Sequence, residues 1–258
     1  MKNFFIFCAS LCLALPLFAQ ENMIFTIHAV HVDGDLNAFE EVEGVYMKKV
    51  AQSSVDNGDI MGWSFAKTLL PDNMNDEGNF NYIFVQSSAS LNDFLDPKIN
   101  WWENADKVLS EEEQKKVDEL RQKFSWKKDV RVIYHVETAL WNENYDGPLF
   151  FQFNFATPKN REGFIEENKT LWNNFFEKNM EKLNMVSWGV ASKVHPLGKD
   201  WSSVVTWDGF RSLKDLYQYR IGVEGIQPPQ ETSKMTEYIP DGFTEMPIYK
   251  EIAATKSK

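Results

Sequence analysis

Alternating hydrophobic and polar residues predict β-strands in two distant parts of the chain. Residues 149–157, LFFQFNFAT, carry phenylalanine at every second position from Phe151 onward, the period of a strand with one buried face. Residues 23–32 are rich in β-branched and aromatic side chains and predict a second such strand. After each strand, apolar residues spaced by three and four predict helices over about 37–53 and 162–183.

An eleven-residue frame occurs twice. MGWSFAKTLLP begins at Met61 and VSWGVASKVHP begins at Val186, and both copies have Trp third, Ala sixth and Pro eleventh. The same offset of 125 residues aligns Phe39 with Phe164. After a turn that is shorter by three residues, SLNDFL aligns with SLKDLY, and the serine of each is a candidate helix N-cap. Matches at a constant offset indicate a repeated structural unit.

Each copy predicts the element order βαββαβ, which is the ferredoxin-like unit. We therefore predict an α+β protein with two tandem units, the first over residues 20–145 and the second over residues 146–258. The first unit has a helical insertion at about 96–129, with a charged helix expected over 110–124. The second has an expected irregular loop over 222–242. Such insertions commonly determine individual function.

This arrangement resembles the dimeric α+β-barrel superfamily. In that superfamily two four-stranded sheets pack face to face as a barrel, with helices outside. It includes antibiotic-biosynthesis-type monooxygenases, the EthD and NIPSNAP groups, and haem-binding groups related to chlorite dismutases and dye-decolorising peroxidases. The resemblance covers nearly all of residues 20–258 and implies a pseudo-dimeric barrel, in which the usual homodimer is fused into one chain.

Residues 1–19 predict a bacterial-type secretory signal peptide. Lys2 precedes an apolar run over residues 4–15, which is followed by a short exit segment. A membrane span needs about 18 apolar residues, so we expect an exported protein, periplasmic or secreted, with no membrane anchor once the leader is removed. Cys8 and Cys12 are the only cysteines, and the mature protein is therefore expected to lack disulfides and thiol nucleophiles.

The chain is acidic, with a formal net charge of −11. An acidic surface repels phosphate backbones, so nucleic-acid binding is not expected. The negative residues gather in the stretches SEEEQKKVDEL and FEEVEG. Both stretches predict solvated surface.

Four histidines limit the possible histidine-based sites, and we take His28, His135 and Glu137 as the catalytic candidates. His135 and Glu137 are two residues apart on a predicted strand and share a face. The ferredoxin-like strand order puts that strand beside the first one, so His28 is expected to approach them, although its alignment with Phe153 gives it an otherwise apolar position. A His–carboxylate pair suits general base catalysis or metal ligation. A hydrogen-bonded polar pair is the simpler interpretation.

No cofactor or metal is predicted. Haem-binding relatives need an axial histidine in the second unit, where the sequence has only His195 at a strand end. Patterns of metalloproteases, EF-hands, P-loops and nucleophile elbows are absent from the sequence.

Aromatic residues supply the candidates for ligand binding. Trp63 and Trp188 occupy matched positions of the repeat, where core packing is the simplest interpretation. Trp101 and Trp102 belong to the insertion, and because adjacent residues of one helix cannot both face inward, we expect one of them at a pocket mouth or partner contact. Tyr134 completes the set of candidates.

These features favour a protein that binds a small apolar or aromatic molecule in a cavity between sheet and helices. One alternative, implied by the resemblance, is a cofactor-independent monooxygenase or isomerase. Another is a structural protein whose insertion binds a partner chain through Trp101 and Trp102. The oligomeric state stays open.

Overall fold

The computed structural model describes residues 22–69, 79–142, 145, 147–198 and 202–256. The predicted signal peptide and both cysteines lie outside the described residues. Within these ranges no helix is both long and apolar enough to span a bilayer.

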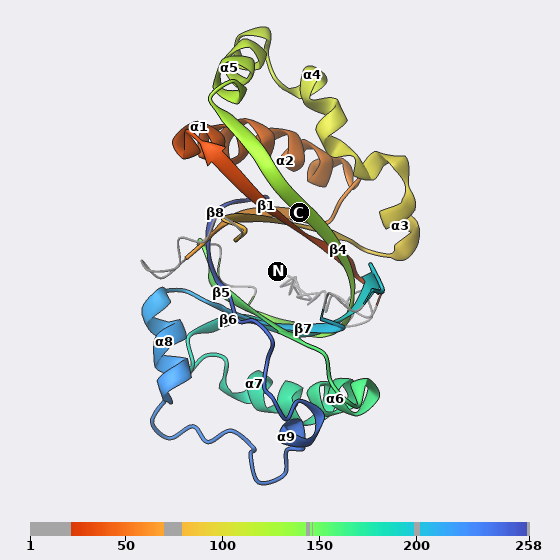
Figure 1. Ribbon diagram of the computed structural model, residues 1–258, viewed down its shortest axis with the longest axis vertical. Coiled ribbons are helices and arrows are strands. Elements are labelled where there is room, and N and C mark those ends of the chain that lie inside the picture. The colour runs from red at the N-terminus through yellow and green to blue at the C-terminus, as the bar shows by residue number, and fades with distance from the viewer. Residues whose placement is uncertain (1–21, 70–78, 143–144, 146, 199–201, 257–258) are drawn as a thin grey trace, which may run out of the picture.

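Eight antiparallel strands of the described chain close into one barrel (Figure 1). Around the barrel they follow the order β1-β3-β2-β8-β5-β7-β6-β4, and β4 pairs again with β1. The strands are β1 (Ile24–Gly34), β2 (Gly62–Thr68), β3 (Tyr82–Ser88), β4 (Phe124–Trp141), β5 (Phe150–Ala156), β6 (Met185–His195), β7 (Val204–Phe210) and β8 (Ile248–Ala254).

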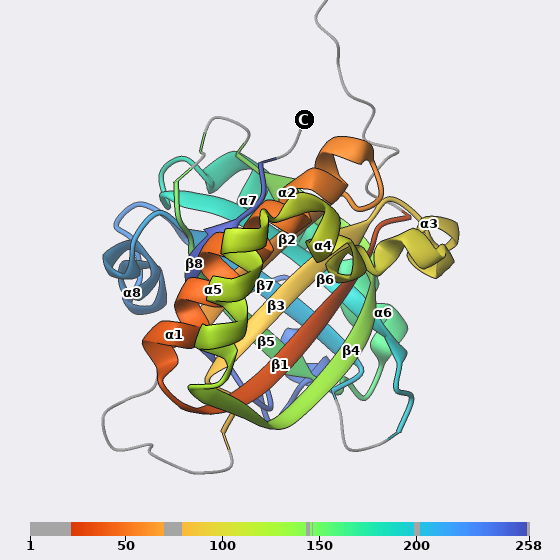
Figure 2. The ribbon, with the colours of Figure 1, turned by 90° about the horizontal axis from the view of Figure 1, so that it is seen from above.

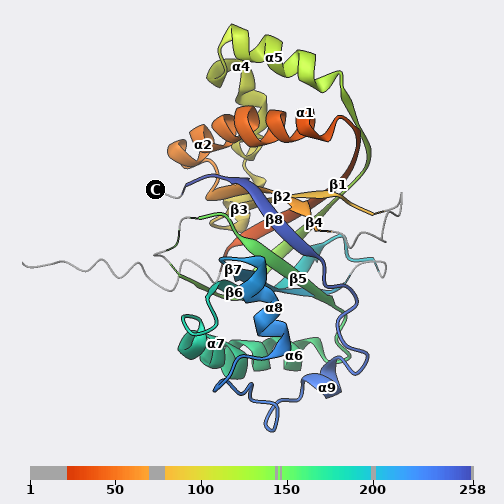
Figure 3. The same ribbon diagram turned by 90° about the vertical axis from the view of Figure 1, so that its left-hand side faces the viewer.

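Helices cover the barrel on two opposite sides, as Figures 1 and 3 show. The first layer comprises α1 (Leu36–Glu41), a π-helical turn (Val42–Met47), α2 (Lys48–Asn57), α3 (Leu91–Leu95), α4 (Ala105–Val108) and α5 (Glu111–Arg121). Short 3₁₀ turns at Pro97–Ile99 and Trp101–Asn104 precede α4. The second layer comprises α6 (Arg161–Glu167), a π-helical turn (Asn168–Trp172), α7 (Asn173–Asn179), α8 (Leu213–Ile221) and α9 (Met235–Tyr238). The predicted α+β class is therefore confirmed.

Aromatic side chains fill the inside of the barrel. One buried cluster takes members from strands all around the barrel, including Phe25 of β1, Tyr134 of β4, Phe153 of β5 and Trp207 of β7. The other buried clusters join the outward-facing strand residues to the helices. The sheet therefore buries both faces, the inner one against itself and the outer one beneath the helical layers.

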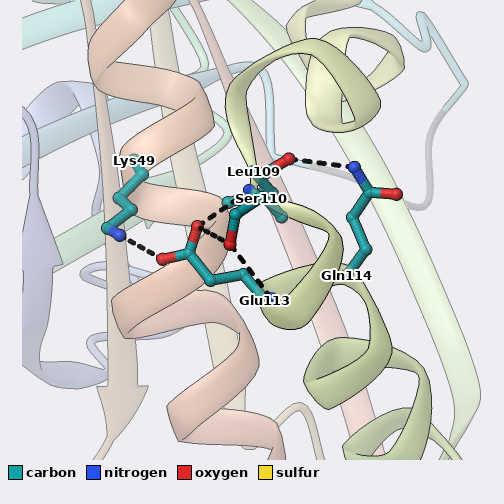
Figure 4. A network of polar contacts seen from close by, with 5 residues as sticks. All are labelled: Lys49, Leu109, Ser110, Glu113 and Gln114. Atoms are coloured by element: carbon teal, nitrogen blue, oxygen red, sulfur yellow. Dashed lines mark hydrogen bonds and ion pairs between the residues drawn. The ribbon is translucent and has the colours of Figure 1, made fainter.

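Serine residues begin the helices where the sequence predicts caps. Ser110 and Glu113 form a capping box on α5, in which each side chain accepts a hydrogen bond from the backbone N–H of the other (Figure 4). Lys49 of α2 forms an ion pair with Glu113 (Figure 4) and so connects α5 to the rest of the layer, in which the two helices lie side by side (Figure 2). The hydroxyls of Ser90 and Ser212 cap α3 and α8 by accepting from the backbone N–H of Asp93 and Asp215, without the reciprocal bond.

Strand β4 corrects one predicted boundary. The sequence predicted a helix over residues 110–124 and a strand from about residue 130, but α5 ends at Arg121 and β4 begins at Phe124. The additional residues of β4 pair with the end of β1 across a β-bulge. Most of them are exposed and three are charged, so alternation of hydrophobic and polar residues does not reveal them.

Strand β1 corrects an alignment of the two halves. The offset of 125 matched His28 with Phe153, but Phe153 packs inside the barrel whereas His28 faces the helical layer. His28 of β1 pairs with Phe84 of β3. In the second half, Asn154 of β5 pairs with Thr206 of β7, the residue equivalent to Phe84. A shift of one residue exchanges the faces of a strand. His28 therefore corresponds to the polar Asn154 and not to an apolar residue.

Candidate functional site

A cavity of about 230 Å³, which we call cavity 1, lies between the outer face of the barrel and the first helical layer. The strands contribute its floor and the helices its walls. Its lining is Thr26, His28, Glu43, Met47, Trp63, Phe84, Gln86, Trp101, Trp102, Arg121, Trp126 and Arg131.

Aromatic rings form most of the apolar lining. The Trp63 ring stacks on Phe84, with centroids 6.1 Å apart, and meets Trp101 edge to face at 5.7 Å. The Trp101 indole donates a hydrogen bond to Gln86 Oε1 at 2.8 Å, which fixes its orientation. Trp101 is buried, whereas 37% of Trp102 is exposed at the opening. The two adjacent indoles thus do not both face inward, as the sequence led us to expect.

Glu43 places a carboxyl group in this aromatic surrounding. It belongs to the π-helical turn Val42–Met47 and is only 9% exposed; such turns are frequent at functional sites. In the part of the chain that the structure describes, nothing donates a hydrogen bond to this carboxyl. Burial raises the pKa of Glu43 to about 7, although the positive charge of Arg121 acts in the opposite direction.

The sequence interpretation of FEEVEG as solvated surface is wrong for Glu43. This residue lies four positions after Phe39 and four before Met47, both buried, so it occupies the apolar face of its helix. A carboxyl at a core-facing helical position is the signal that could have identified it.

Besides Glu43, the lining of cavity 1 contains three basic residues, His28, Arg121 and Arg131. His28 Nε2 lies 3.0 Å from Asp129 Oδ2. Burial lowers the pKa of His28, and the neighbouring Arg131 adds to that effect, while the hydrogen bond with Asp129 raises it. The Arg131 guanidinium lies over the Trp102 ring, 5.6 Å from its centroid, a cation–π arrangement. The permanent positive charges of cavity 1 are therefore its two arginines.

The predicted catalytic group does not assemble. His135 and Glu137 do share a face, with Nδ1 and Oε1 3.8 Å apart, but they lie outside the lining of cavity 1. Glu137 accepts a hydrogen bond from Ser192 at 2.6 Å. In the β1–β4 ladder the partner of His135 is Ile24, four residues before His28, which is about 13 Å along a strand. The expected approach of His28 is therefore wrong.

The candidate ligand-binding residues are divided among three places. Trp63, Trp101 and Trp102 line cavity 1. Tyr134 lies inside the barrel, stacked on Phe25 with ring centroids 5.4 Å apart. Trp188 lines a separate cavity below the second helical layer.

This second cavity, which we call cavity 2, also has a volume of about 230 Å³. Its floor is a buried polar network on β5 and β7. Asn154 donates hydrogen bonds to Asp208 Oδ2 at 2.7 Å and to Thr206 Oγ1 at 3.0 Å, and Arg220 Nε donates to Gln152 Oε1 at 2.7 Å. Burial raises the pKa of Asp208 to about 6, against the opposing effects of Asn154 and Arg220.

Strand pairing relates the two cavities. Gln86 lies between Trp63 and Thr26 on neighbouring strands of the first half. Asp208 lies in the same way between Trp188 and Gln152 in the second half.

The helices continue this correspondence. Glu43 of the first π-helical turn and Asn168 of the second are 125 residues apart, the offset of the repeat. Cavity 1 thus has an acid on the helix and an amide, Gln86, on the strand, whereas cavity 2 has the reverse arrangement, with Asp208 on the strand. The Asn168 side chain donates a hydrogen bond to the Phe164 carbonyl at 2.8 Å, an interaction that an ionised glutamate cannot make.

Metal-ligating residues are dispersed. Among the residues with described positions, no three of the His, Asp, Glu or Cys type come together in a way that could hold a metal ion. His195 ends β6 and is exposed, in agreement with its interpretation as a residue at a strand end.

Comparison with known proteins identifies the fold alone. No protein-family model and no curated protein sequence matches the chain. A candidate monooxygenase from Lactobacillus acidophilus NCFM has a similar structure, with a TM-score of 0.55, 10% identity and coverage of 92% of this chain and 97% of that one. A candidate monooxygenase from Fusobacterium nucleatum gives a TM-score of 0.54 at 9% identity, with coverage of 91% and 94%. At 9–10% identity these similarities show a shared fold and nothing beyond it.

Proposed function

We propose that the chain consists of two ferredoxin-like units, residues 20–145 and 146–258, fused into a pseudo-dimeric barrel. The strand orders of the two halves support this proposal, because β4-β1-β3-β2 and β8-β5-β7-β6 follow the same pattern. The N-terminal pattern of residues 1–19 supports export to the periplasm or the exterior.

We further propose that cavity 1 binds a small, planar, apolar or aromatic molecule. The observation that carries this proposal is the set of indole rings of Trp63, Trp101 and Trp102 around one cavity. An apolar cavity of about 150 Å³ accommodates benzene, so the volume of about 230 Å³ leaves room for a substituted ring or two fused rings. Aromatic walls favour flat ligands, because ring stacking adds to the burial of apolar area.

Titration of the purified protein with one- and two-ring aromatic compounds tests this proposal, with tryptophan fluorescence and calorimetry as readouts. We expect Trp101→Leu to weaken binding about tenfold or more, since it removes one wall and its anchoring hydrogen bond. Trp141→Leu is the matched control, because Trp141 lies outside both cavities and is half exposed. Binding that survives Trp101→Leu but disappears in Trp188→Leu would assign the ligand to cavity 2 and overturn the proposal.

A second candidate function is that of a cofactor-independent monooxygenase or isomerase. The Glu43 carboxyl favours it, because a general base that lines a cavity can remove a proton from a bound molecule. The names of two solved structures that share this fold agree with the monooxygenase alternative. Incubation of the ligand of cavity 1 without added cofactor tests both: a product formed with oxygen uptake indicates the monooxygenase, and a product of unchanged mass indicates the isomerase.

A further inference from the structure

The Glu43 carboxyl differs from the other buried carboxyl that lines a cavity. In cavity 2, Asp208 accepts a hydrogen bond from Asn154 at 2.7 Å, so its position is fixed by the network. In cavity 1, Glu43 is more than nine-tenths buried and receives no hydrogen bond from any residue of the described chain. A carboxyl that is largely desolvated and has no protein donor is costly in its ionised form, and the Glu43 oxygens are not enclosed by protein but open to cavity 1. Such a carboxyl is retained more readily where a bound molecule supplies the missing contact.

The charges around Glu43 favour formation of an anion in the cavity. Arg121 and Arg131 both line cavity 1. Arg121 acts electrostatically on Glu43, and its guanidinium lies 3.7 Å from the sulfur of Met47 in the same π-helical turn. If Glu43 becomes neutral by taking a proton from a ligand, the negative charge passes to the ligand. It then remains beside two guanidinium groups, which favour an oxyanion in a cavity of low dielectric constant.

We propose that Glu43 is a catalytic base that removes a proton from a carbon next to the carbonyl group of a ketone that carries an aromatic ring and is bound in cavity 1. The proton passes to the carboxylate. The electron pair of the broken C–H bond forms the C=C bond of an enolate, whose negative charge lies on the carbonyl oxygen. Return of the proton to the same carbon restores the neutral ketone, so the reaction consumes no oxidant and no cofactor. This inference rests on the proposed binding function.

The protonation state of Glu43 agrees with this assignment. A base is most effective when its pKa lies near the working pH, and the pKa of Glu43 is about 7. Buried Trp63 and Trp101 line the cavity with Glu43, and an apolar surrounding strengthens electrostatic effects.

Hydrogen–deuterium exchange of a probe ketone tests the inference. The probe is 2-tetralone, which has two fused rings and exchangeable protons beside its carbonyl group, and exchange in D₂O is followed by ¹H NMR. We expect the wild-type protein to accelerate exchange with a rate that rises through a single ionisation near pH 7. Glu43→Gln should reduce the catalysed rate about 100-fold or more, with the dissociation constant of 2-tetralone changed by no more than about threefold.

Two further variants make the test specific. Glu40→Gln makes the same chemical change one helical turn earlier, at a carboxylate that already accepts hydrogen bonds from Tyr82 and Lys67, at 2.7 Å and 2.9 Å, and that does not line cavity 1. It should exchange the probe at the wild-type rate. Glu43→Asp keeps a carboxylate on a shorter side chain and should retain part of the activity that Glu43→Gln loses.

The possible failures are distinguishable. If 2-tetralone binds to the wild-type protein but its exchange is no faster than in buffer, or if Glu43→Gln exchanges it as fast as the wild type, the catalytic inference is wrong and the binding function stands. If neither 2-tetralone nor any other aromatic compound binds, the binding function is itself wrong and the inference falls with it.

Discussion

Glu43→Gln should stabilise the folded protein at alkaline pH. The substitution keeps the size of the side chain but removes its charge. In the folded protein burial raises the pKa of Glu43 from 4.5 to about 7, whereas in the unfolded chain the carboxyl has its ordinary value. The native state therefore binds more protons than the unfolded state between these two values. Its stability must fall as the pH rises through that window.

The magnitude follows from the two pKa values. The favourable contribution of protonated Glu43 is fully present below about pH 4.5 and is lost by the time the pH exceeds about 7. At about 1.4 kcal/mol for each pH unit, the difference amounts to roughly 3 kcal/mol at pH 8. Glutamine has no ionised form, so the variant should be more stable than the wild type by about this amount at pH 8 and nearly equal to it at pH 4.

Thermal and urea unfolding at pH 4 and pH 8 measure this difference. For a chain of this length about 3 kcal/mol corresponds to roughly 6–12 °C in Tm. Glu40→Gln is again the control, since it removes the negative charge that pairs with Lys67 and receives the hydrogen bond of Tyr82, and it should give no gain at pH 8. Equal stability of Glu43→Gln and wild type at both pH values would refute the account of Glu43 as a buried, unpaired carboxyl.

Three further substitutions test other parts of the structure. Asn154→Ala removes the donor to buried Asp208 and should cost about 1–3 kcal/mol in urea unfolding, with a larger loss at pH 8 than at pH 4 because the ionised carboxylate depends on that donor. In Gly189→Ala the new methyl group overlaps the Trp207 ring inside the barrel, so we expect a loss of about 1–3 kcal/mol and altered near-ultraviolet circular dichroism. His135→Ala should leave ligand affinity unchanged and stability within about 0.5 kcal/mol, since His135 lies outside cavity 1; a tenfold loss of affinity would contradict our assignment of the site.

Local chemistry made the elements predictable. A serine followed by an acid three residues later identified the starts of three helices, because this pair satisfies backbone N–H groups without help from the rest of the fold. The matched Trp63 and Trp188 identified equivalent strands. The beginning of β4 escaped notice because Lys127, Lys128 and Asp129 are exposed, and their strand conformation depends on pairing with β1.

The site was less predictable because it depends on which face each side chain occupies. The alignment of His28 with Phe153 was wrong by one position. Because successive residues of a strand point to opposite faces, that error assigned His28 to the wrong face of the sheet. The burial of Glu43 was not predicted because the nearby Glu40 and Glu41 are also acidic. Only the position of each residue around the helix distinguishes the buried carboxyl from the two more exposed ones. The clustering of Trp63 with Trp101 depends on the path of the insertion, which no local pattern specifies.

The exchange of acid and amide between the two cavities gives a physical reason for assigning them different functions. On the strand of cavity 2, Asp208 lies within hydrogen-bonding distance of Asn154, a partner from the adjacent strand, so its carboxylate completes a network that holds the sheet. On the helix of cavity 1, Glu43 lines the same cavity as the indole rings, and the strand contributes Gln86, whose amide oxygen already accepts from Trp101. Fold stability explains the acid of cavity 2 but not that of cavity 1. We therefore expect Glu43, and not Asp208, to be the carboxyl that serves catalysis.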